Sequence, residues 1–207
     1  MDEQTQEAIE TRKWYDATVS GPLSRVEMDE FLAGKWLIKI AATKADGWPS
    51  VVPVWYQWEH GSFWAVGRKR SEWVHDLMRD PRCAICIEEK EIPPDGGNRK
   101  VLAQCIAEVV EGPVVAEGSR WVEVANKMAL RYVGPDGPAA LSRSYGWERF
   151  LVELRPRGGK ITTFQGVDWH RRYFDPGQRP DLEAKARDAK AQETSPSDTG
   201  PGERAGS

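Results

Sequence analysis

Three consecutive cations occupy the segment Gly67–Ser71 (Gly-Arg-Lys-Arg-Ser), directly before a stretch with a helical pattern. A helix N-terminus presents backbone N–H groups without intrahelical partners and the positive end of the helix dipole. Arginine can grip an oxyanion through two parallel hydrogen bonds, and lysine adds a point charge. The pattern therefore predicts a phosphate-binding turn, with a solvated loop and a good helix cap as the plainer alternative. The residues predicted to bind the phosphate are Arg68, Lys69, Arg70 and Ser71.

A second group of candidates is aromatic. The chain contains ten tryptophans, against five tyrosines and five phenylalanines, and two of them lie in the segment Pro53–Trp58. Because side chains alternate across a strand, this segment presents two faces: Val54, Tyr56 and Trp58 on one, and Trp55 and Gln57 on the other. A flat heterocycle could stack along one of these faces. An aromatic core or a subunit interface is the alternative.

Two further candidates lie near the end of the predicted domain, where Trp169 is followed by His170 and two arginines. An indole beside cations could close over a bound cofactor. A terminal segment held in place by its aromatic side chains is the alternative. His60, His75 and His170 are scattered along the chain, which is more typical of structural or solvated histidines than of a catalytic group.

The sequence predicts no metal site. Cys83 and Cys86 lie in a predicted strand, where residues three apart face opposite ways, so their sulfurs diverge. A zinc site would also need two more ligands, and there is no second pair of cysteines. With Cys105, the chain has three cysteines, an odd number in a sequence without an export signal, so we expect structural thiols.

The elements expected to position these groups are mostly strands. Helices are predicted directly after Ser71 and over residues 119–132. Strands are predicted over residues 36–43, 50–58, 62–66, 82–88 and 101–110, followed by a last hairpin of 149–155 with 160–164. A run of antiparallel strands with inserted helices and no βαβ alternation favours a small barrel. Pro53 favours an edge or a bulge in the second strand.

The composition divides the chain into three parts. Residues 23–175 form the predicted folded domain. Residues 1–22 form an N-terminal helical extension set apart by Gly21-Pro22, and residues 176–207 form a polar tail with one large apolar residue, Leu182. Such a tail cannot bury enough surface to offset its ordering entropy, so we expect it to be disordered.

Composition and charge also limit the partners. Hydrophobic residues make up 40% of the 207 residues and charged residues 29%, with a net charge of −3. No apolar run approaches the roughly 20 residues of a membrane helix, and the acidic N-terminus is unlike a signal peptide. We therefore expect a cytoplasmic protein that binds neither membrane nor nucleic acid.

The order of these segments resembles the pyridoxamine 5′-phosphate oxidase-like family of flavin- and deazaflavin-dependent split-barrel proteins. The resemblance spans about residues 26–173, and its motifs are specific as a series although each is loose alone. The segments that carry it are Lys39–Trp55, Phe63–Arg68, Leu77–Arg82 and Arg131–Gly134.

The resemblance implies a mainly β fold with inserted helices, a six-stranded antiparallel split β-barrel of the FMN-binding type. It also implies a homodimer with two cofactor sites at the subunit interface. By position, Val52, Pro53, Val54 and Trp55 would lie beside the flavin ring, Ala65 and Val66 would approach the ring or its ribityl chain, and Arg68, Lys69, Arg70 and Ser71 would bind the phosphate. Trp73 and Trp169 complete the predicted cofactor-binding residues, and Trp73 stands where many relatives carry lysine or arginine.

The implied activity is that of an oxidoreductase using FMN, or alternatively the 8-hydroxy-5-deazaflavin coenzyme, on a small planar or hydrophobic substrate. Tyr56 and His170 are the candidate acid–base residues. Some relatives bind haem or bilins, so a non-catalytic flavin-, haem- or bilin-binding or sensing protein of the same fold is the alternative.

Overall fold

Nine strands form one sheet in the computed structural model, which describes residues 18–90 and 98–166. The strands are β1 (Thr18–Ser20), β2 (Ile38–Thr43), β3 (Pro49–Val54), β4 (Gln57–Glu59), β5 (Ser62–Arg68), β6 (Arg82–Glu88), β7 (Arg99–Val114), β8 (Arg149–Pro156) and β9 (Lys160–Gln165). The helices are α2 (Arg25–Leu32), α3 (Glu72–Arg79), α4 (Trp121–Tyr132) and α5 (Gly137–Ser142), and a 3₁₀ turn, η2 (Arg157–Gly159), joins β8 to β9.

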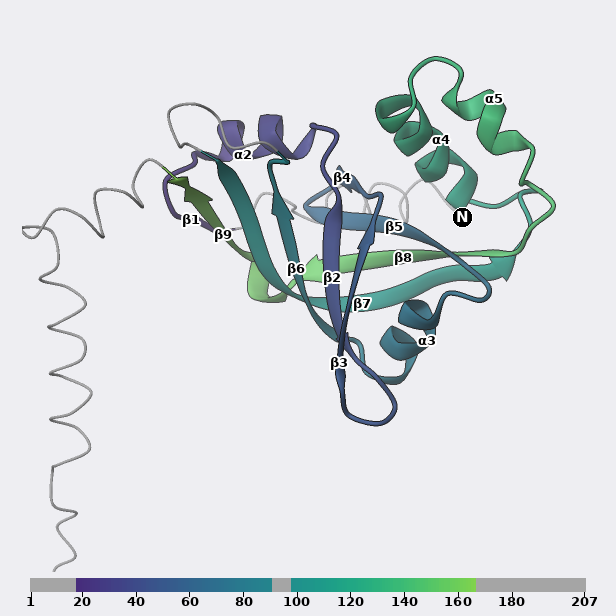
Figure 1. The fold of residues 1–207 in the computed structure, drawn as a ribbon, viewed down its shortest axis with the longest axis horizontal. Helices are drawn as coiled ribbons and strands as arrows, with labels where there is room; N and C mark the ends of the chain where they lie inside the picture. The colour runs from purple at the N-terminus through teal and green to yellow at the C-terminus, as the bar shows by residue number, and fades with distance from the viewer. Residues whose placement is uncertain (1–17, 91–97, 167–207) are drawn as a thin grey trace, which may run out of the picture. The chain divides into compact units, whose positions relative to one another are not determined.

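The sheet follows the order β3-β2-β6-β7-β8-β5-β4, and all of these neighbours are antiparallel. β9 extends it by pairing with the start of β7, and β1 adds a short parallel pair with β9. The sheet curls into a half-barrel that stays open between β3 and the β4–β5 hairpin, because no pairing joins them in the described part of the chain (Figure 1). The predicted mainly β, split-barrel fold is confirmed.

Three regions with predictions lie outside the described residues. They are most of the N-terminal extension, part of the loop before β7, and everything after Gly166, which includes Trp169, His170 and the polar tail. The described residues all belong to one unit that ends at Gly166. The predicted domain boundaries stay predictions. Within the described ranges, none of the helices has the length and apolar character needed to cross a bilayer.

The second predicted strand is broken in the structure. β3 ends at Val54 and β4 begins at Gln57, and the two lie at opposite ends of the sheet order. The chain leaves the sheet at Trp55 and Tyr56 because Tyr56 is drawn into the core, where its hydroxyl donates to the Leu32 carbonyl at 2.8 Å. β3 itself pairs only with β2, so the edge position predicted from Pro53 is confirmed.

The predicted hairpin of the last two strands is wrong. β8 and β9 do not pair with each other, and both run along the same side of β7, so they read as one strand interrupted by η2. Gly158 and Gly159 adopt positive φ angles of 59° and 68°. These two glycines therefore form a bulge that lets the chain continue along β7 instead of reversing it.

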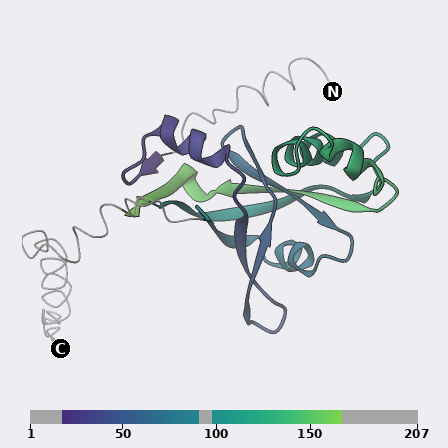
Figure 2. The same cartoon turned by 45° about the horizontal axis from the view of Figure 1, so that its top comes forward.

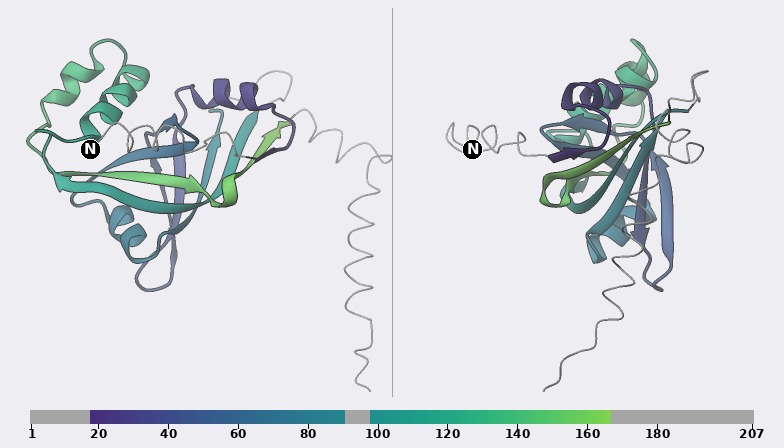
Figure 3. Two further views of the ribbon diagram at one scale, coloured as in Figure 1. Left: turned by 180° about the vertical axis from the view of Figure 1, so that it is seen from behind. Right: turned by 90° about the vertical axis from the view of Figure 1, so that its left-hand side faces the viewer.

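Two hydrophobic cores lie on the two faces of the sheet. The barrel interior packs side chains from α2, α3 and the inward face of the strands, including Phe31, Tyr56 and Phe63. On the other face, Trp121, Met128 and Leu151 form a second cluster in which α4 covers β5 and β8. As a result, α3 and the α4–α5 pair lie on opposite sides of the β5–β8 ribbon, which the views agree on (Figures 1, 2 and 3).

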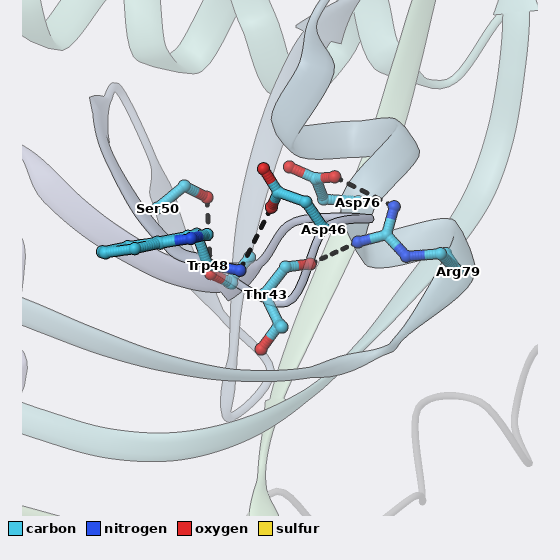
Figure 4. A network of polar contacts seen from close by, with 7 residues as sticks. Thr43, Asp46, Trp48, Ser50, Asp76 and Arg79 are labelled. Atoms are coloured by element: carbon cyan, nitrogen blue, oxygen red, sulfur yellow. Dashed lines mark hydrogen bonds and ion pairs between the residues drawn. The ribbon is translucent and has the colours of Figure 1, made fainter.

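Polar contacts attach α3 to the turn of the β2–β3 hairpin (Figure 4). The Arg79 guanidinium donates to the Thr43 carbonyl and pairs with the largely buried Asp76 carboxylate at 3.1 Å. Within the turn, the Asp46 carboxylate accepts the Trp48 N–H at 3.1 Å. The C-terminal end of α3 is therefore held by the hairpin, and its N-terminal end faces the turn that follows β5.

Candidate functional site

The turn between β5 and α3 is closed by its own residues. The Arg68 N–H donates to the Ser71 hydroxyl oxygen at 3.0 Å, and the Ser71 N–H donates back to the Arg68 carbonyl at 2.8 Å. Ser71 is the N-cap residue of α3, but its hydroxyl makes no capping bond to the helix. The turn is thus rigid, and the first N–H groups of α3 are not satisfied by that side chain.

Gly67 brings α3 close to β5. A Cβ at this position would lie 2.4 Å from Val74 Cγ2 and 3.1 Å from Trp73 Cζ2, which leaves no room for a side chain. Trp73 is only 9% exposed and packs in the barrel core. Its side chain therefore positions α3 and presents little surface to a ligand.

The three cations of the turn have different environments. Arg68, Lys69 and Arg70 are all exposed. The Lys69 ammonium pairs with the Glu148 carboxylate at 2.7 Å. The Arg68 guanidinium lies over the Trp147 ring, 5.7 Å from its centroid. Within the described ranges neither Arg68 nor Arg70 is in ion-pair distance of a carboxylate, so two of the three charges remain available to an anion.

The aromatic segment divides between the two faces as predicted. Val52 and Val54 pack against the barrel core, whereas Pro53 is exposed on the outer face of the edge strand. Trp55 is 41% exposed and stacks on Tyr132 of α4, with centroids 4.8 Å apart and an interplanar angle of 5°. The outer face of β3 is therefore followed by a flat, partly exposed indole.

The end of β5 offers mainly its backbone. The Ala65 side chain is fully buried in the barrel core, and Val66 packs against the α4 cluster on the other face. A ligand that runs along this strand would meet main-chain atoms and the Val66 methyl groups at most.

Tyr56, the described candidate for acid–base work, is fully buried. Burial raises the pKa of its phenol well above the ordinary value. The neighbouring Tyr132 raises this pKa further, whereas the charge of Arg131 lowers it. With its hydroxyl committed to the Leu32 carbonyl, the phenol has no exposed atom for a substrate. The structure gives Tyr56 a packing role, and the acid–base role has no geometric support.

Sequence reasoning missed the side chains that reach this region from the start of β8. Trp147 and Glu148 contact Arg68 and Lys69. Arg149 is 8% exposed, and its Nη2 donates to the Ser144 hydroxyl at 2.7 Å. The sequence signal was present as the run Trp-Glu-Arg before an apolar strand, but only the pairing of β8 with β5 connects it to the cationic turn.

Solved structures with a similar architecture are known. A conserved hypothetical protein, Rv2991 from Mycobacterium tuberculosis, is similar over 72% of this chain and 88% of its own, with a TM-score of 0.58 and 23% identity. HutZ, the haem storage protein from Vibrio cholerae, is similar over 64% of this chain and 89% of its own, with a TM-score of 0.50 and 20% identity. The chain has the split-barrel fold. No family model and no curated protein matches it.

The outer face of this split barrel is hollowed and carries exposed apolar side chains among polar ones. Strand register places Val51, Leu102 and Ile106 on the side of the sheet away from the core, and each is more than a third exposed. A hollow of about 640 Å³ lies on the same face near η2. Its lining includes Leu102, Gln104, Arg157, Lys160 and Thr162.

The cysteines of the split barrel follow the predicted alternation. Cys83 and Cys105 are buried and lie directly opposite each other in the β6–β7 pair, whereas Cys86 is on the outer face. In the part of the chain that the structure covers, no three histidine, cysteine or acidic side chains are grouped as metal ligands.

Proposed function

We propose that this protein binds FMN and acts as a flavin-dependent oxidoreductase on a small planar or hydrophobic substrate, with the 8-hydroxy-5-deazaflavin coenzyme as the alternative cofactor. The observation that carries the proposal is the turn Arg68–Ser71. In a split barrel, it presents two arginines that have no carboxylate partner among the described residues, at the end of a strand and the start of a helix. Both cofactors carry a phosphate, the group that such a turn recognises.

The residues present fit a phosphorylated flavin. Arg68 and Arg70 would contact the phosphate, and the rigid hydrogen-bonded turn pre-organises them. The exposed Pro53 and the indole of Trp55 offer an apolar surface to a flat ring. Among the described strands β3 pairs only with β2, so main-chain groups on its other edge could hydrogen-bond to the ring's polar rim, although Pro49 and Pro53 have no N–H to donate.

The bound flavin would supply hydride transfer through its central ring. The protein's own contribution is to orient the cofactor and to place hydrogen-bond donors where negative charge gathers on reduction. Arg68 and Arg70 would anchor the phosphate end, and the free edge of β3 would face the N1–C2 carbonyl edge. No side chain among the described residues is assigned a proton transfer, since Tyr56 is buried and hydrogen-bonded inside the core.

We further propose that the protein is a homodimer in which the outer sheet face is the subunit interface. Its exposed apolar side chains are Val51, Leu102, Ile106 and Phe164, together with the smaller Ala84. These side chains lie on the same face of β3, β6, β7 and β9, with Gln104 and Lys100 between them, and apolar side chains gathered on an exposed face favour association. The face adjoins β3, so the partner subunit would help to enclose a ring bound there.

The experiment is a titration of the purified protein with FMN and with riboflavin, which lacks the phosphate. Replacing both Arg68 and Arg70 by alanine is expected to weaken FMN binding by at least ~1.5 kcal/mol, about tenfold, and to leave riboflavin binding unchanged. The control variant, Lys44→Ala with Arg143→Ala, removes two exposed charges elsewhere and should leave both affinities unchanged.

Unchanged FMN affinity in the Arg68/Arg70 variant would place the phosphate elsewhere. The absorbance spectrum after purification and stopped-flow reduction by NAD(P)H test the activity. A bound flavin that neither a nicotinamide nor reduced deazaflavin can reduce, or a haem spectrum in place of a flavin spectrum, would favour the non-catalytic alternative.

A further inference from the structure

Arg149 carries a buried charge that has no counterion within residues 18–90 and 98–166. Only 8% of the residue is exposed, and its Nε finds no hydrogen-bond acceptor. Its Nη2 donates to the Ser144 hydroxyl, and its guanidinium lies 5.3 Å from the centroid of the Trp121 ring. Among the residues that the structure describes, no carboxylate pairs with it.

The charge that acts on this guanidinium is that of another cation, Arg68. Arg68 and Arg149 are directly opposite each other in the β5–β8 pair, so their side chains leave the same face of the sheet. Burial lowers the pKa of Arg149, and the charge of Arg68 lowers it further. Two guanidinium groups thus repel each other at one end of the sheet.

A buried cation without a partner is costly, because burial removes its hydration and nothing replaces it. The carboxylate of the preceding residue, Glu148, does not neutralise Arg149, because it pairs with Lys69 at 2.7 Å. The arrangement becomes favourable when an anion sits between the two arginines and accepts hydrogen bonds from both.

We propose that Arg149 is the inner half of an oxyanion site whose outer half is Arg68. Ser144 is a positioning residue: its hydroxyl accepts from Arg149 and donates to the Leu141 carbonyl at 2.8 Å, which fixes the guanidinium. The ligand is a phosphate group. Identifying it as the phosphate of the bound cofactor rests on the proposed function.

Arg149→Met is the central variant, since methionine fills the apolar space without the charge. The probe is inorganic phosphate, measured by calorimetric titration and by its effect on the melting temperature in a buffer free of phosphate and sulfate. The matched control is Arg143→Met, because Arg143 is exposed and only six residues away.

We expect wild type and Arg143→Met to bind phosphate and to melt at a higher temperature in its presence. Arg149→Met should bind phosphate at least about tenfold more weakly and, without phosphate, melt at the same or a higher temperature than wild type. A purely structural Arg149 predicts the reverse: a lower melting temperature and an unchanged phosphate affinity. That result, or no phosphate binding by wild type, overturns the inference.

Arg149→Lys tests the hydrogen-bonded geometry separately, because it keeps the charge but loses the planar fork. It should weaken phosphate binding several-fold, and full affinity in this variant also counts against the site. FMN and riboflavin titrations separate the two proposals. Phosphate binding that depends on Arg149 without any flavin binding overturns the proposed function alone, whereas FMN binding together with a phosphate affinity that Arg149→Met leaves unchanged overturns this inference alone.

Discussion

Tyr56 illustrates how a residue that looks chemical can be structural. Its ring is fully buried, and its hydroxyl donates to the Leu32 carbonyl at 2.8 Å. Because burial raises the pKa of the phenol above its unfolded value near 10, the native state keeps a proton that the unfolded chain loses in alkali. The stabilisation is therefore fully present below about pH 10 and is lost as the pH rises above it.

Tyr56→Phe is expected to lower the free energy of unfolding by about 1 kcal/mol at pH 7, since one buried hydrogen bond is lost. The decline of stability above about pH 10 should also be shallower than in wild type, because one titrating group is gone. Urea unfolding between pH 7 and pH 11 measures both effects. A folded, flavin-binding Tyr56→Phe that has lost all oxidoreductase activity would instead restore the acid–base role.

Gly67 controls the fit of one element against another. Alanine at this position would bring its Cβ within 2.4 Å of Val74, whose branched side chain is stiff, so α3 would have to move away from β5. We expect Gly67→Ala to lower the free energy of unfolding by about 1–3 kcal/mol. It should also weaken FMN binding, because the cationic turn moves with the helix.

Gly146→Ala is the matched control for this prediction. Gly146 lies in the connection before β8, and a Cβ there would meet no atom within 4 Å. Urea unfolding and FMN titration of both variants provide the comparison. Equal stability of the two alanine variants would mean that α3 adapts freely, and the turn would not then depend on this close packing.

Local patterns predicted part of the fold. Alternation placed Tyr56 and Trp55 on opposite faces, and Pro53 indicated an edge or a bulge; the structure puts Tyr56 in the core, Trp55 at the surface and β3 at the edge. The pattern could not show that the chain leaves the sheet at Trp55, because that break depends on a contact with Leu32, distant in sequence. The sequence Gly158-Gly159 is also compatible with either a chain reversal or a bulge, and only the pairing of β9 with β7 distinguishes them.

The candidate site was predictable to the same extent. The cations of the turn Arg68–Ser71 are contiguous in the sequence, so charge and helix polarity were enough to find them. Arg149 lies 81 positions after Arg68 in the sequence and is brought opposite it only by the β5–β8 pairing. Its burial results from α4 packing on the second face of the sheet. Such a residue becomes visible only when the strand pairing is known.

At the scale of the whole molecule, the proposed dimer rests on the outer sheet face. In the described strands β2 and β6, inward positions such as Ile40 and Ile85 are buried, while the opposite face stays open. Leu102 lies on β7 in the middle of this face and borders the hollow near η2. A subunit packed here would cover apolar area that the single chain leaves in contact with water.

Leu102→Asp is expected to convert a dimer into a monomer. The leucine is already 36% exposed, so the charge costs the isolated chain little, but the interface would have to bury a charged group in place of an apolar one. Leu130→Asp makes the same change at a leucine that is 54% exposed on α4, away from this face, and should leave the dimer intact. Size-exclusion chromatography with light scattering distinguishes the two.

FMN affinity should fall with Leu102→Asp only, because a ring enclosed by two subunits loses one wall. A wild-type protein that is monomeric at micromolar concentration and still binds FMN would confine the site to one chain.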